Sequence, residues 1–426
     1  MPPSRLGRYE VRAKIADGGM AVLHVARRDD GEIVALKMIR DELSRNDEFL
    51  TMFLDEAKIV GLLRHPNIVR YHELCTVGGR AFIAMELLFG QSLWSVWDAC
   101  RQRGVRLRYD MLAWIGARVC DALHYAHELR GGEGEVSGHA LGIVHRDVNA
   151  TNVFVTYDGV VKVIDFGLAK AANRVSKTAA GVIKGKVAYM SPEQAVGAPV
   201  DRRTDVFALG ITLWEIACDR RLFKQPDDVD TLKRVHAAEV PDPTLLVDGF
   251  PSTLWAILRR ALARDPEDRY STAAEMARAL DAFVGGAVDS KVVAQVMAEL
   301  FAEERARQEK WIADVSAADG TEAARKASLA APLQSKSTFW AEDERLPATP
   351  TVPPPPGLAP AATPPSKVQP APSDRGDGRR RAGDGGDGHR EGAEHAARST
   401  ARALVPIVVV IAVVVAAVVG GALLLR

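Results

Sequence analysis

The sequence lacks an excess of either charge, a paired cysteine motif and an apolar run at its start. Its 426 residues include 55 Lys and Arg against 55 Asp and Glu, so the formal net charge is zero. This balance provides no general attraction to nucleic acid, and we expect no nucleic-acid partner. The four cysteines are scattered without a CxxC spacing, which argues against a metal site or disulfides and favours reduced thiols in a cytosolic domain. Residues 1–5 have no apolar stretch, so no signal peptide is expected.

The most informative polar stretch comprises residues 145–152 together with 164–167. It places Asp147, Asn152 and Asp165 close together along the chain. Apolar, β-branched segments surround them and predict short buried strands at 142–144, 153–155 and 160–164. A hairpin of this kind can aim all three oxygen-bearing side chains at one point. One of them could accept a proton, and two could hold a hard divalent cation, which prefers oxygen ligands.

The N-terminal region predicts antiparallel strands. Residues 9–40 alternate as strands do, and a turn at 29–31 joins two of them. The loop between the first two strands carries Gly18 and Gly19, which allow backbone N–H groups to approach phosphates closely. An ordinary glycine-rich hairpin turn is the alternative interpretation of this loop.

Helices and one insertion are expected between the strands and the end of the domain. Helical periodicity predicts helices at 47–63 and 109–129 and a helical region at 201–280. Residues 80–93 are typical of a strand, a hinge and a helix start capped by Ser92. The polar, Gly-rich segment 130–139 predicts an exposed, mobile loop, either a neutral surface insertion or a docking element.

The C-terminal part predicts one helix, a linker and a membrane span. Apolar residues at helical spacing over 292–311 predict a helix that packs on the helical region before it, with partner binding or self-association as the alternative. Residues 313–402 are rich in proline, glycine and charge, so we expect a disordered linker. Leu404–Leu425 contains 22 residues without a charge, and a helix of this length is about 33 Å long, enough to cross a membrane.

The charges beside this apolar segment predict its direction. Basic residues, among them Arg398 and Arg402, precede the segment, and only Arg426 follows it, so the N-terminal side is expected to be cytoplasmic. The sequence therefore predicts a single-pass protein of the inner (cytoplasmic) membrane. Gly420 and Gly421 leave a small surface that a second helix could approach, which permits a homodimer.

In their order along the chain, these motifs resemble those of protein kinases. The matching segments are Ala16–Ala21, Val34–Lys37, His145–Asn152, Asp165–Gly167, Ser191–Glu193, Asp205–Gly210 and Arg264–Tyr270. The resemblance covers residues 9–284 and is strongest to bacterial Hanks-type serine/threonine protein kinases. It implies an α+β, two-lobed kinase fold, with a small antiparallel β-sheet lobe at 9–87 and a helical large lobe at 88–284. A helical extension at 285–312 would then precede the disordered linker at 313–402 and the transmembrane helix at 404–425.

The resemblance implies ATP as phosphoryl donor, Mg²⁺ or Mn²⁺ as the metal and proteins as substrates. Lys37 would hold the α- and β-phosphates, and Glu56 would position this lysine. Asp147 would orient the substrate hydroxyl and accept its proton, while Asn152 and Asp165 would bind the metal. The residues expected around the nucleotide are Ile15, Ala16, Asp17, Gly18, Gly19, Leu23, Ala35, Lys37, Met85, Glu86, Leu88 and Phe154.

Further roles follow from the same resemblance. His145 and Phe166 would stack in an apolar spine that links the lobes, and Glu193 with Arg269 would form a buried ion pair. The segment after the Asp-Phe-Gly motif resembles an activation segment. Its expected phosphorylation sites are Thr178 and Ser176, with Thr178 preferred, and an attached phosphate could pair with Arg146.

Three positions depart from the kinase pattern. The nucleotide loop has alanine at two of its three glycine positions. Asn149 lies where serine/threonine kinases usually carry lysine, and Lys186 lies where they carry threonine. We expect Lys186 to supply, close to Asp147, the cation that position 149 lacks. The rival hypothesis is a catalytically weak pseudokinase that acts as a membrane-tethered, nucleotide-binding scaffold.

Overall fold

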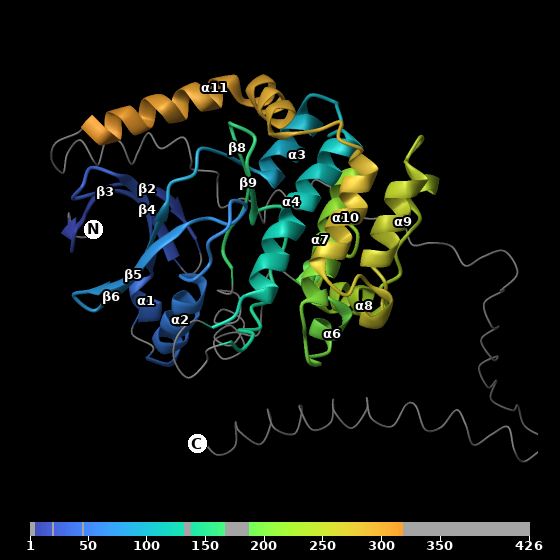
Figure 1. Cartoon of the computed structure of the whole chain (residues 1–426), viewed down its shortest axis with the longest axis horizontal. Coiled ribbons are helices and arrows are strands. Elements are labelled where there is room, and N and C mark those ends of the chain that lie inside the picture. The colour runs from blue at the N-terminus through green and yellow to red at the C-terminus, as the bar shows by residue number, and fades with distance from the viewer. Residues whose placement is uncertain (1–4, 19–20, 45–46, 132–137, 167–186, 318–426) are drawn as a thin grey trace, which may run out of the picture. The chain divides into compact units, whose positions relative to one another are not determined.

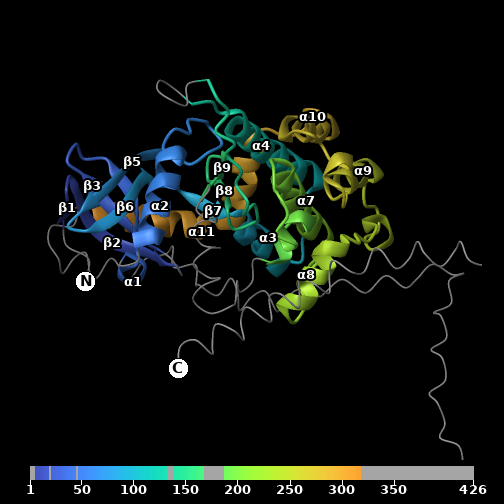
Figure 2. The ribbon, with the colours of Figure 1, turned by 90° about the horizontal axis from the view of Figure 1, so that it is seen from below.

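The computed structural model describes residues 5–18, 21–44, 47–131, 138–166 and 187–317 (Figure 1). These residues form a lobe of antiparallel strands, a lobe of helices and one long helix after them. Figure 2 shows the strands β1–β6 gathered at one end, and the helices α4, α7, α9 and α10 at the other. The predicted two-lobed α+β architecture is confirmed.

The small lobe is a six-stranded antiparallel sheet in the order β1-β2-β3-β4-β6-β5. Its strands are β1 (Arg5–Leu6), β2 (Tyr9–Asp17), β3 (Ala21–Arg28), β4 (Ile33–Ile39), β5 (Tyr71–Val77) and β6 (Arg80–Glu86). Gly31, at a φ of +91°, lies in the predicted turn between β3 and β4. Helices α1 (Asp41–Ser44) and α2 (Asp47–Val60) follow β4, so the helix predicted at 47–63 is confirmed with an earlier end.

The large lobe is built around one extended apolar core. Its helices are α3 (Leu93–Gln102), α4 (Tyr109–Glu128), α6 (Pro192–Ala195), α7 (Arg203–Cys218), α8 (Asp228–Ala237), α9 (Ser252–Ala261) and α10 (Ala273–Val284), with 3₁₀ turns at Val187–Tyr189, Pro243–Leu245 and Pro266–Asp268. α3 begins at its predicted cap, because Ser92 Oγ accepts the N–H of Ser95 at 3.1 Å. α7 is buried from Thr204 to Cys218, as expected of a helix that is apolar on all sides.

A three-stranded sheet, β7 (Gly90–Ser92), β8 (Val153–Thr156) and β9 (Val161–Val163), supports the stretch of polar residues described above. The strands predicted at 153–155 and 160–164 are confirmed, whereas the strand predicted at 142–144 is wrong. Ile143 is buried, but the N–H groups that follow it, on His145 and Arg146, donate to a carboxylate instead of a neighbouring strand. Apolar β-branched residues can be buried in an extended loop as well as in a strand.

Several predictions concern residues beyond the described parts. The insertion predicted at 130–139 is closed at its base by a bridge between Arg130 and Ala140, and residues 132–137 lie outside the description. The segment predicted to span a membrane at 404–425 also lies outside it, as does most of the linker predicted at 313–402. Across residues 5–317, with the gaps given above, no helix has both the length and the apolar character needed to cross a bilayer.

The last described helix, α11 (Ser290–Ala317), differs from its prediction in length and in position. It continues beyond the predicted boundary at 312, and it is bent at Phe301, where φ is −133° and ψ is 30°. We expect the helix over 292–311 to pack on the large lobe. α11 contacts α3 of the large lobe and β2 of the small lobe. Burial of Val315 against the small lobe explains why the helix extends past 312.

Candidate active site

Asp147 lies at the centre of the loop between α4 and β8, and its carboxylate is held by two amides. Asn152 Nδ2 donates to Asp147 Oδ2 at 2.9 Å and to the Asp147 carbonyl at 2.7 Å. Asn149 Nδ2 donates to the other carboxylate oxygen at 3.1 Å and to the same carbonyl at 3.0 Å. All three side chains are buried. Two neutral donors of its own loop therefore help to orient the Asp147 carboxylate.

The β8–β9 hairpin brings Asn152 and Asp165 to the same end of the small sheet. Asn152 immediately precedes β8, Asp165 follows the end of β9, and the Ile164 N–H donates to the Asn152 carbonyl at 3.0 Å. The predicted hairpin geometry is thus present. Asp165 has a φ of +61°, a left-handed conformation that is uncommon for a residue with a side chain and is often found at functional sites.

Lys37 on β4 reaches across the lobes to Asp165. Its Nζ lies 2.5 Å from Asp165 Oδ1. The lysine is largely buried, whereas the carboxylate is partly exposed. The backbone of Glu56 lies in α2, but its side chain is outside the described part, and the predicted pair between Glu56 and Lys37 stays a prediction.

Strand register places the residues predicted around adenine on the face of the sheet that carries Lys37. Leu23 is directly opposite Lys37, and Ala35 is directly opposite Met85. Directly opposed residues of antiparallel strands share a face, and so do residues two apart in one strand, as Ala35 and Lys37 are. Leu23, Ala35, Lys37 and Met85 therefore face the same side.

The other wall of this site comes from β8. Phe154 is directly opposite Lys162 of β9, so the two side chains share a face. The Lys162 Nζ lies 2.7 Å from Glu86 Oε1, at the end of β6, which orients that face toward the hinge. The Glu86 N–H already donates to the Arg70 carbonyl at 2.9 Å, so only its carbonyl could serve the predicted bond to adenine. Leu88 follows in the hinge and packs against the main core.

The nucleotide loop is held by a residue that the sequence analysis missed. Ile15, Ala16 and Asp17 end β2, and the Gly18 N–H donates to the Ala21 carbonyl at 3.0 Å to close the turn. Arg40, after β4, donates from Nε to the Gly18 carbonyl at 2.7 Å and pairs with Asp17. A lone arginine at a strand end carries no sequence signal for this role, because the contact depends on the sheet register.

Asp205, at the start of α7, begins a segment that matches the kinase pattern, but the sequence analysis did not predict its contacts with the loop before Asp147. Its two carboxylate oxygens accept the N–H groups of His145 and Arg146, both at 2.8 Å, and His127 Nε2 lies 2.8 Å from Oδ2. Burial alone raises the pKa of this carboxyl, but the contact with His127 and the donated N–H groups outweigh burial and hold the pKa below its usual range. Arg146 is thereby held at a φ of +66°.

The predicted contact between His145 and Phe166 is confirmed. The two ring centroids lie 4.6 Å apart, and both side chains are fully buried. His145 Nε2 lies 2.9 Å from the Ile164 carbonyl, which fixes the ring beside β9. The two motifs that carry Asp147 and Asp165 are therefore packed against each other.

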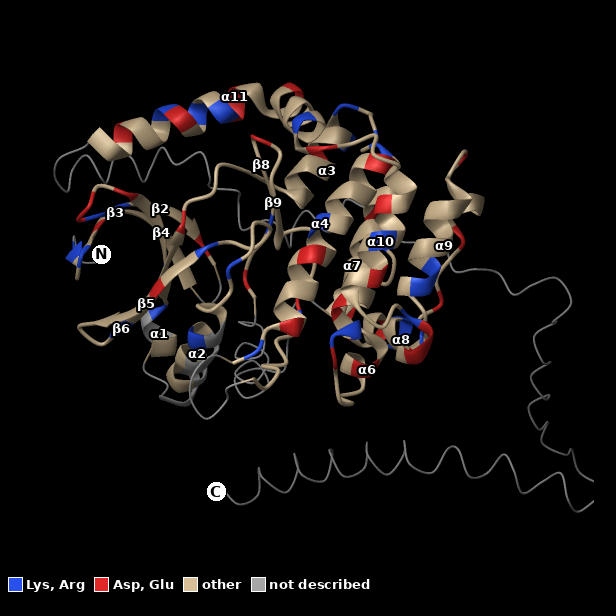
Figure 3. Ribbon diagram, in the orientation of Figure 1, with Lys and Arg blue, Asp and Glu red and all other residues tan. Residues whose placement is uncertain are grey.

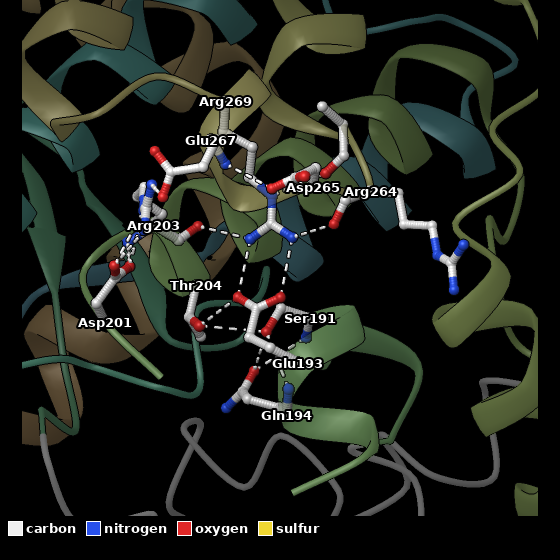
Figure 4. A network of polar contacts seen from close by, with 11 residues as sticks. Ser191, Glu193, Gln194, Asp201, Arg203, Thr204, Arg264, Asp265, Glu267 and Arg269 are labelled. Atoms are coloured by element: carbon white, nitrogen blue, oxygen red, sulfur yellow. Dashed lines mark hydrogen bonds and ion pairs between the residues drawn. The ribbon is translucent and has the colours of Figure 1, made fainter. Parts of the chain in front are cut away.

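The buried ion pair predicted between Glu193 and Arg269 is also confirmed (Figure 4). The Arg269 guanidinium donates to both Glu193 oxygens, at 2.8 and 2.9 Å, and Thr204 Oγ1 donates to Oε1 at 2.8 Å. Burial alone raises the pKa of Glu193, but the guanidinium outweighs burial and lowers the pKa to about 2. The pair fixes the start of α6 to the rest of the large lobe.

Five predicted site features lie outside the described residues or side chains, and they stay predictions. They are Gly19, the side chain of Glu56, Ser176, Thr178 and Lys186.

Comparison with known proteins agrees with this geometry. The family model described as "Protein kinase domain" matches residues 9–280. The chain is 40% identical over 285 residues to the "Tyrosine-protein kinase MasK" of Myxococcus xanthus, covering 65% of this chain and 43% of that protein. It is 35% identical over 286 residues to the "Serine/threonine-protein kinase PknB" of Mycobacterium leprae, again covering 65% and 43%.

A solved structure shows the same fold. The kinase domain of Mycobacterium tuberculosis PknI is 24% identical in sequence, covers 65% of this chain and 97% of its own, and has a TM-score of 0.50. The chain spans about two fifths of the length of these two curated relatives. With the family match over most of the two-lobed region, this chain belongs to the protein kinase family.

Proposed function

We propose that this chain is an ATP-dependent protein kinase that transfers the γ-phosphoryl group to serine and threonine hydroxyls of proteins, in membrane-tethered signalling. The observation that carries the proposal is the presence of two contacts, one between Asp147 and Asn152 and one between Lys37 and Asp165. A base, a phosphate-binding cation and two oxygen-bearing groups for a metal are the parts that phosphoryl transfer requires. Their assembly favours an active kinase over the pseudokinase scaffold.

The side chains present suit a magnesium ion. Asp165 offers a carboxylate. Asn152 can offer its amide oxygen to the ion, because its Nδ2 is the atom that donates to Asp147. Among the described residues, no three His, Cys, Asp or Glu side chains gather as a metal site. Mg²⁺ in such enzymes is usually held by one or two protein oxygens together with water and phosphate oxygens. A bound ion would neutralise charge on the phosphates.

The chain's own residues would carry the transfer as follows. The substrate oxygen bonds to the γ-phosphorus, the bond from this phosphorus to the β–γ bridging oxygen breaks, and the hydroxyl proton passes to Asp147. Asn149 and Asn152 orient that carboxylate in advance. Lys37 would hold the α- and β-phosphates of ATP, and ADP leaves after transfer. Catalysis of this kind is mostly positioning and charge stabilisation.

The surroundings of Asn149 support a role for Lys186 as the active-site cation. The Asn149 amide donates to Asp147, and its side-chain oxygen accepts the Thr151 N–H at 2.9 Å. Position 149 thus supplies neutral hydrogen bonds and no positive charge. Phosphoryl transfer by Lys186→Ala should fall strongly, and the double variant Asn149→Lys, Lys186→Thr should recover it. Full activity in Lys186→Ala would mean that the cation comes from elsewhere.

Autophosphorylation of the activation segment is part of the proposal. Thr178 is the preferred acceptor and Ser176 the second, with Arg146 available to pair with the phosphate. Loss of both hydroxyls, in Thr178→Ala with Ser176→Ala, should lower activity. A double variant as active as the wild type would rule out control by these two sites.

A single-pass anchor at 404–425 completes the proposal. It would hold the kinase domain on the cytoplasmic side of the inner membrane, and Gly420 and Gly421 would permit a homodimer.

The deciding experiment incubates the full chain in detergent with Mg²⁺, labelled ATP and a general protein substrate. Phosphoamino-acid analysis should find phosphoserine and phosphothreonine, and mass spectrometry should find phosphate on Thr178. The matched variant Asp147→Asn keeps the shape of the side chain and should transfer about 10²- to 10⁴-fold more slowly. ATP binding without transfer by the wild type would support the scaffold, and phosphotyrosine alone would contradict the proposed specificity.

A further inference from the structure

Helix α11 bridges the two lobes of the kinase domain (Figure 1). Its N-terminal half lies on the large lobe, where Arg103 Nη2 donates to the Leu300 carbonyl at 2.7 Å. Gly159, in the turn between β8 and β9, lies so close that a Cβ atom there would be 1.9 Å from the Ser290 carbonyl oxygen. This half of α11 therefore lies directly against the large lobe, and its apolar side chains, among them Val293 and Met297, join the core of that lobe.

The C-terminal half of α11 is seated on the small lobe. Trp311 and Val315 are 4% and 1% exposed, and they form one apolar cluster with Ala13, Ile15 and Val25. The exposed side of the same helix carries alternating acidic and basic residues (Figure 3). An apolar stripe on one side and charges on the other is the pattern of a helix that packs on its own domain.

The register of the sheet shows which face of the small lobe α11 covers. Ala13 is directly opposite Val25, and Val25 is directly opposite Ala35. Directly opposed residues share a face, so the α11 cluster lies on the face of Ala35, which also carries Lys37. The cluster thus adjoins the residues proposed to contact the nucleotide.

Two residues connect the α11 cluster to the core beneath the hinge. Leu23, proposed to contact adenine, packs against both clusters. Leu87 also packs against both, and it lies between Glu86 and Leu88, the proposed hinge contacts to adenine. Gln308 of α11 is buried close by, with its Nε2 3.5 Å from the Gly90 carbonyl of β7. The helix therefore borders the nucleotide site from the glycine loop strands to the hinge.

We propose that the C-terminal half of α11, with Trp311 at its centre, forms the outer wall of the ATP site and holds the two lobes at the separation that binds ATP. This inference rests on the proposed nucleotide site. Trp311 acts as a positioning residue through Ile15, Leu23 and Leu87. A site whose walls are fixed before the ligand arrives binds more tightly, because less ordering is left to occur on binding.

The test measures nucleotide affinity directly in the full chain, with Mg²⁺ and a fluorescent ATP analogue. Trp311→Ala should raise the Kd about tenfold, which corresponds to about 1.4 kcal/mol. Trp311→Phe keeps an aromatic side chain and should restore most of the affinity. In steady-state assays the KM for ATP should rise, while the KM for the protein substrate stays the same. An unchanged Kd in Trp311→Ala overturns the inference, and so does a lower Kd, which would mean that α11 obstructs the site.

Two control variants distinguish a specific effect of Trp311 on the nucleotide site from a general loss of stability. Leu6→Ala removes a buried side chain from a separate apolar cluster of the same sheet, so it should lower stability without changing the Kd. Glu303→Ala changes an exposed α11 residue and should change neither. Binding without transfer by the wild type would contradict the proposed activity and leave the α11 inference standing. Equal binding by the wild type and Trp311→Ala would contradict the α11 inference and leave the proposed activity standing. A wild type that binds no nucleotide would contradict both the proposed activity and the α11 inference.

Discussion

At the scale of single residues, the orientation of Asp147 depends on two amides that bind its two carboxylate oxygens separately. Asn152 is expected from the kinase pattern, whereas Asn149 departs from it. The structure gives Asn149 a specific place, since it links Asp147 to Thr151 through a buried side chain. The departure at position 149 therefore does not leave the catalytic loop unsupported.

The first prediction concerns Asn149. Asn149→Ala removes one hydrogen bond to the Asp147 carboxylate, and a net loss of about 1.5 kcal/mol corresponds to a kcat roughly tenfold lower. Asn149→Asp keeps the acceptor for Thr151 but places a second carboxylate beside Asp147, so it should be the slower of the two variants. Steady-state phosphoryl transfer measures both. An Asn149→Asp variant as active as the wild type would show that this contact does not orient the base.

At the scale of elements, the Glu193–Arg269 pair joins α6 to the large lobe and predicts a pH dependence. The pKa of Glu193 is about 2 in the folded chain and near its ordinary value of 4.5 in the unfolded one. A lowered folded pKa stabilises the fold above the unfolded pKa, and this contribution is lost as the pH falls from about 5 toward 2.

The corresponding variant is Glu193→Gln, which leaves the buried Arg269 without its ionic partner. It should lower the free energy of unfolding by about 3–5 kcal/mol at pH 7, and the difference from the wild type should shrink as the pH approaches 3. Urea unfolding at both pH values measures the effect. The control is Glu267→Gln, an exposed partner of Arg203, with an expected loss below about 1 kcal/mol. A constant difference across the pH range would contradict the assignment.

The seat of α11 on the β8–β9 turn gives a third prediction. Gly159→Ala adds a Cβ atom that meets the Ser290 carbonyl and also requires a side chain at a φ of +82°. Gly31→Ala is the matched control, because it has a φ of +91° with no atom within 4 Å, so it meets only the backbone strain of about 1–2 kcal/mol. Thermal unfolding should show a clearly larger loss for Gly159→Ala. Equal losses would mean that α11 can move away at little cost.

At the scale of the whole molecule, the proposed anchor at 404–425 predicts where the protein is found. A chain that ends at residue 403 should move from the membrane fraction to the soluble fraction, because it lacks the uncharged, Val- and Ala-rich stretch that is long enough to span a bilayer. Fractionation of cells that express each form tests this expectation. The control is the full chain with Asp147→Asn, which should stay with membranes. A shortened chain that still sediments with membranes would refute the anchor.

Most of the strands and helices could be predicted from local pattern alone, whereas their two-lobed arrangement followed from the resemblance to kinases. Strand alternation, helical periodicity and the Ser92 cap depend on neighbours in sequence, so the strands, most helices and the spacing of Asp147, Asn152 and Asp165 follow from the chain itself. The ion pair between Glu193 and Arg269 was also predictable, although only through resemblance to kinases. Local pattern could not separate a buried loop from a strand at 142–144, since burial and β-branching are common to both.

The order of residues thus determined the strands and most helices, because alternation and helical periodicity are short-range patterns. The two-lobed arrangement and the roles proposed for Asp147, Asn152 and Asp165 followed from the resemblance of the ordered motifs to those of kinases. Only the tertiary structure decided that Asp205 supports the loop before Asp147 and that Arg40 binds the glycine loop. It also decided that Trp311 packs on the face of the sheet that carries Lys37. These contacts join residues distant in sequence, and their formation depends on sheet register and lobe packing, which no local pattern specifies.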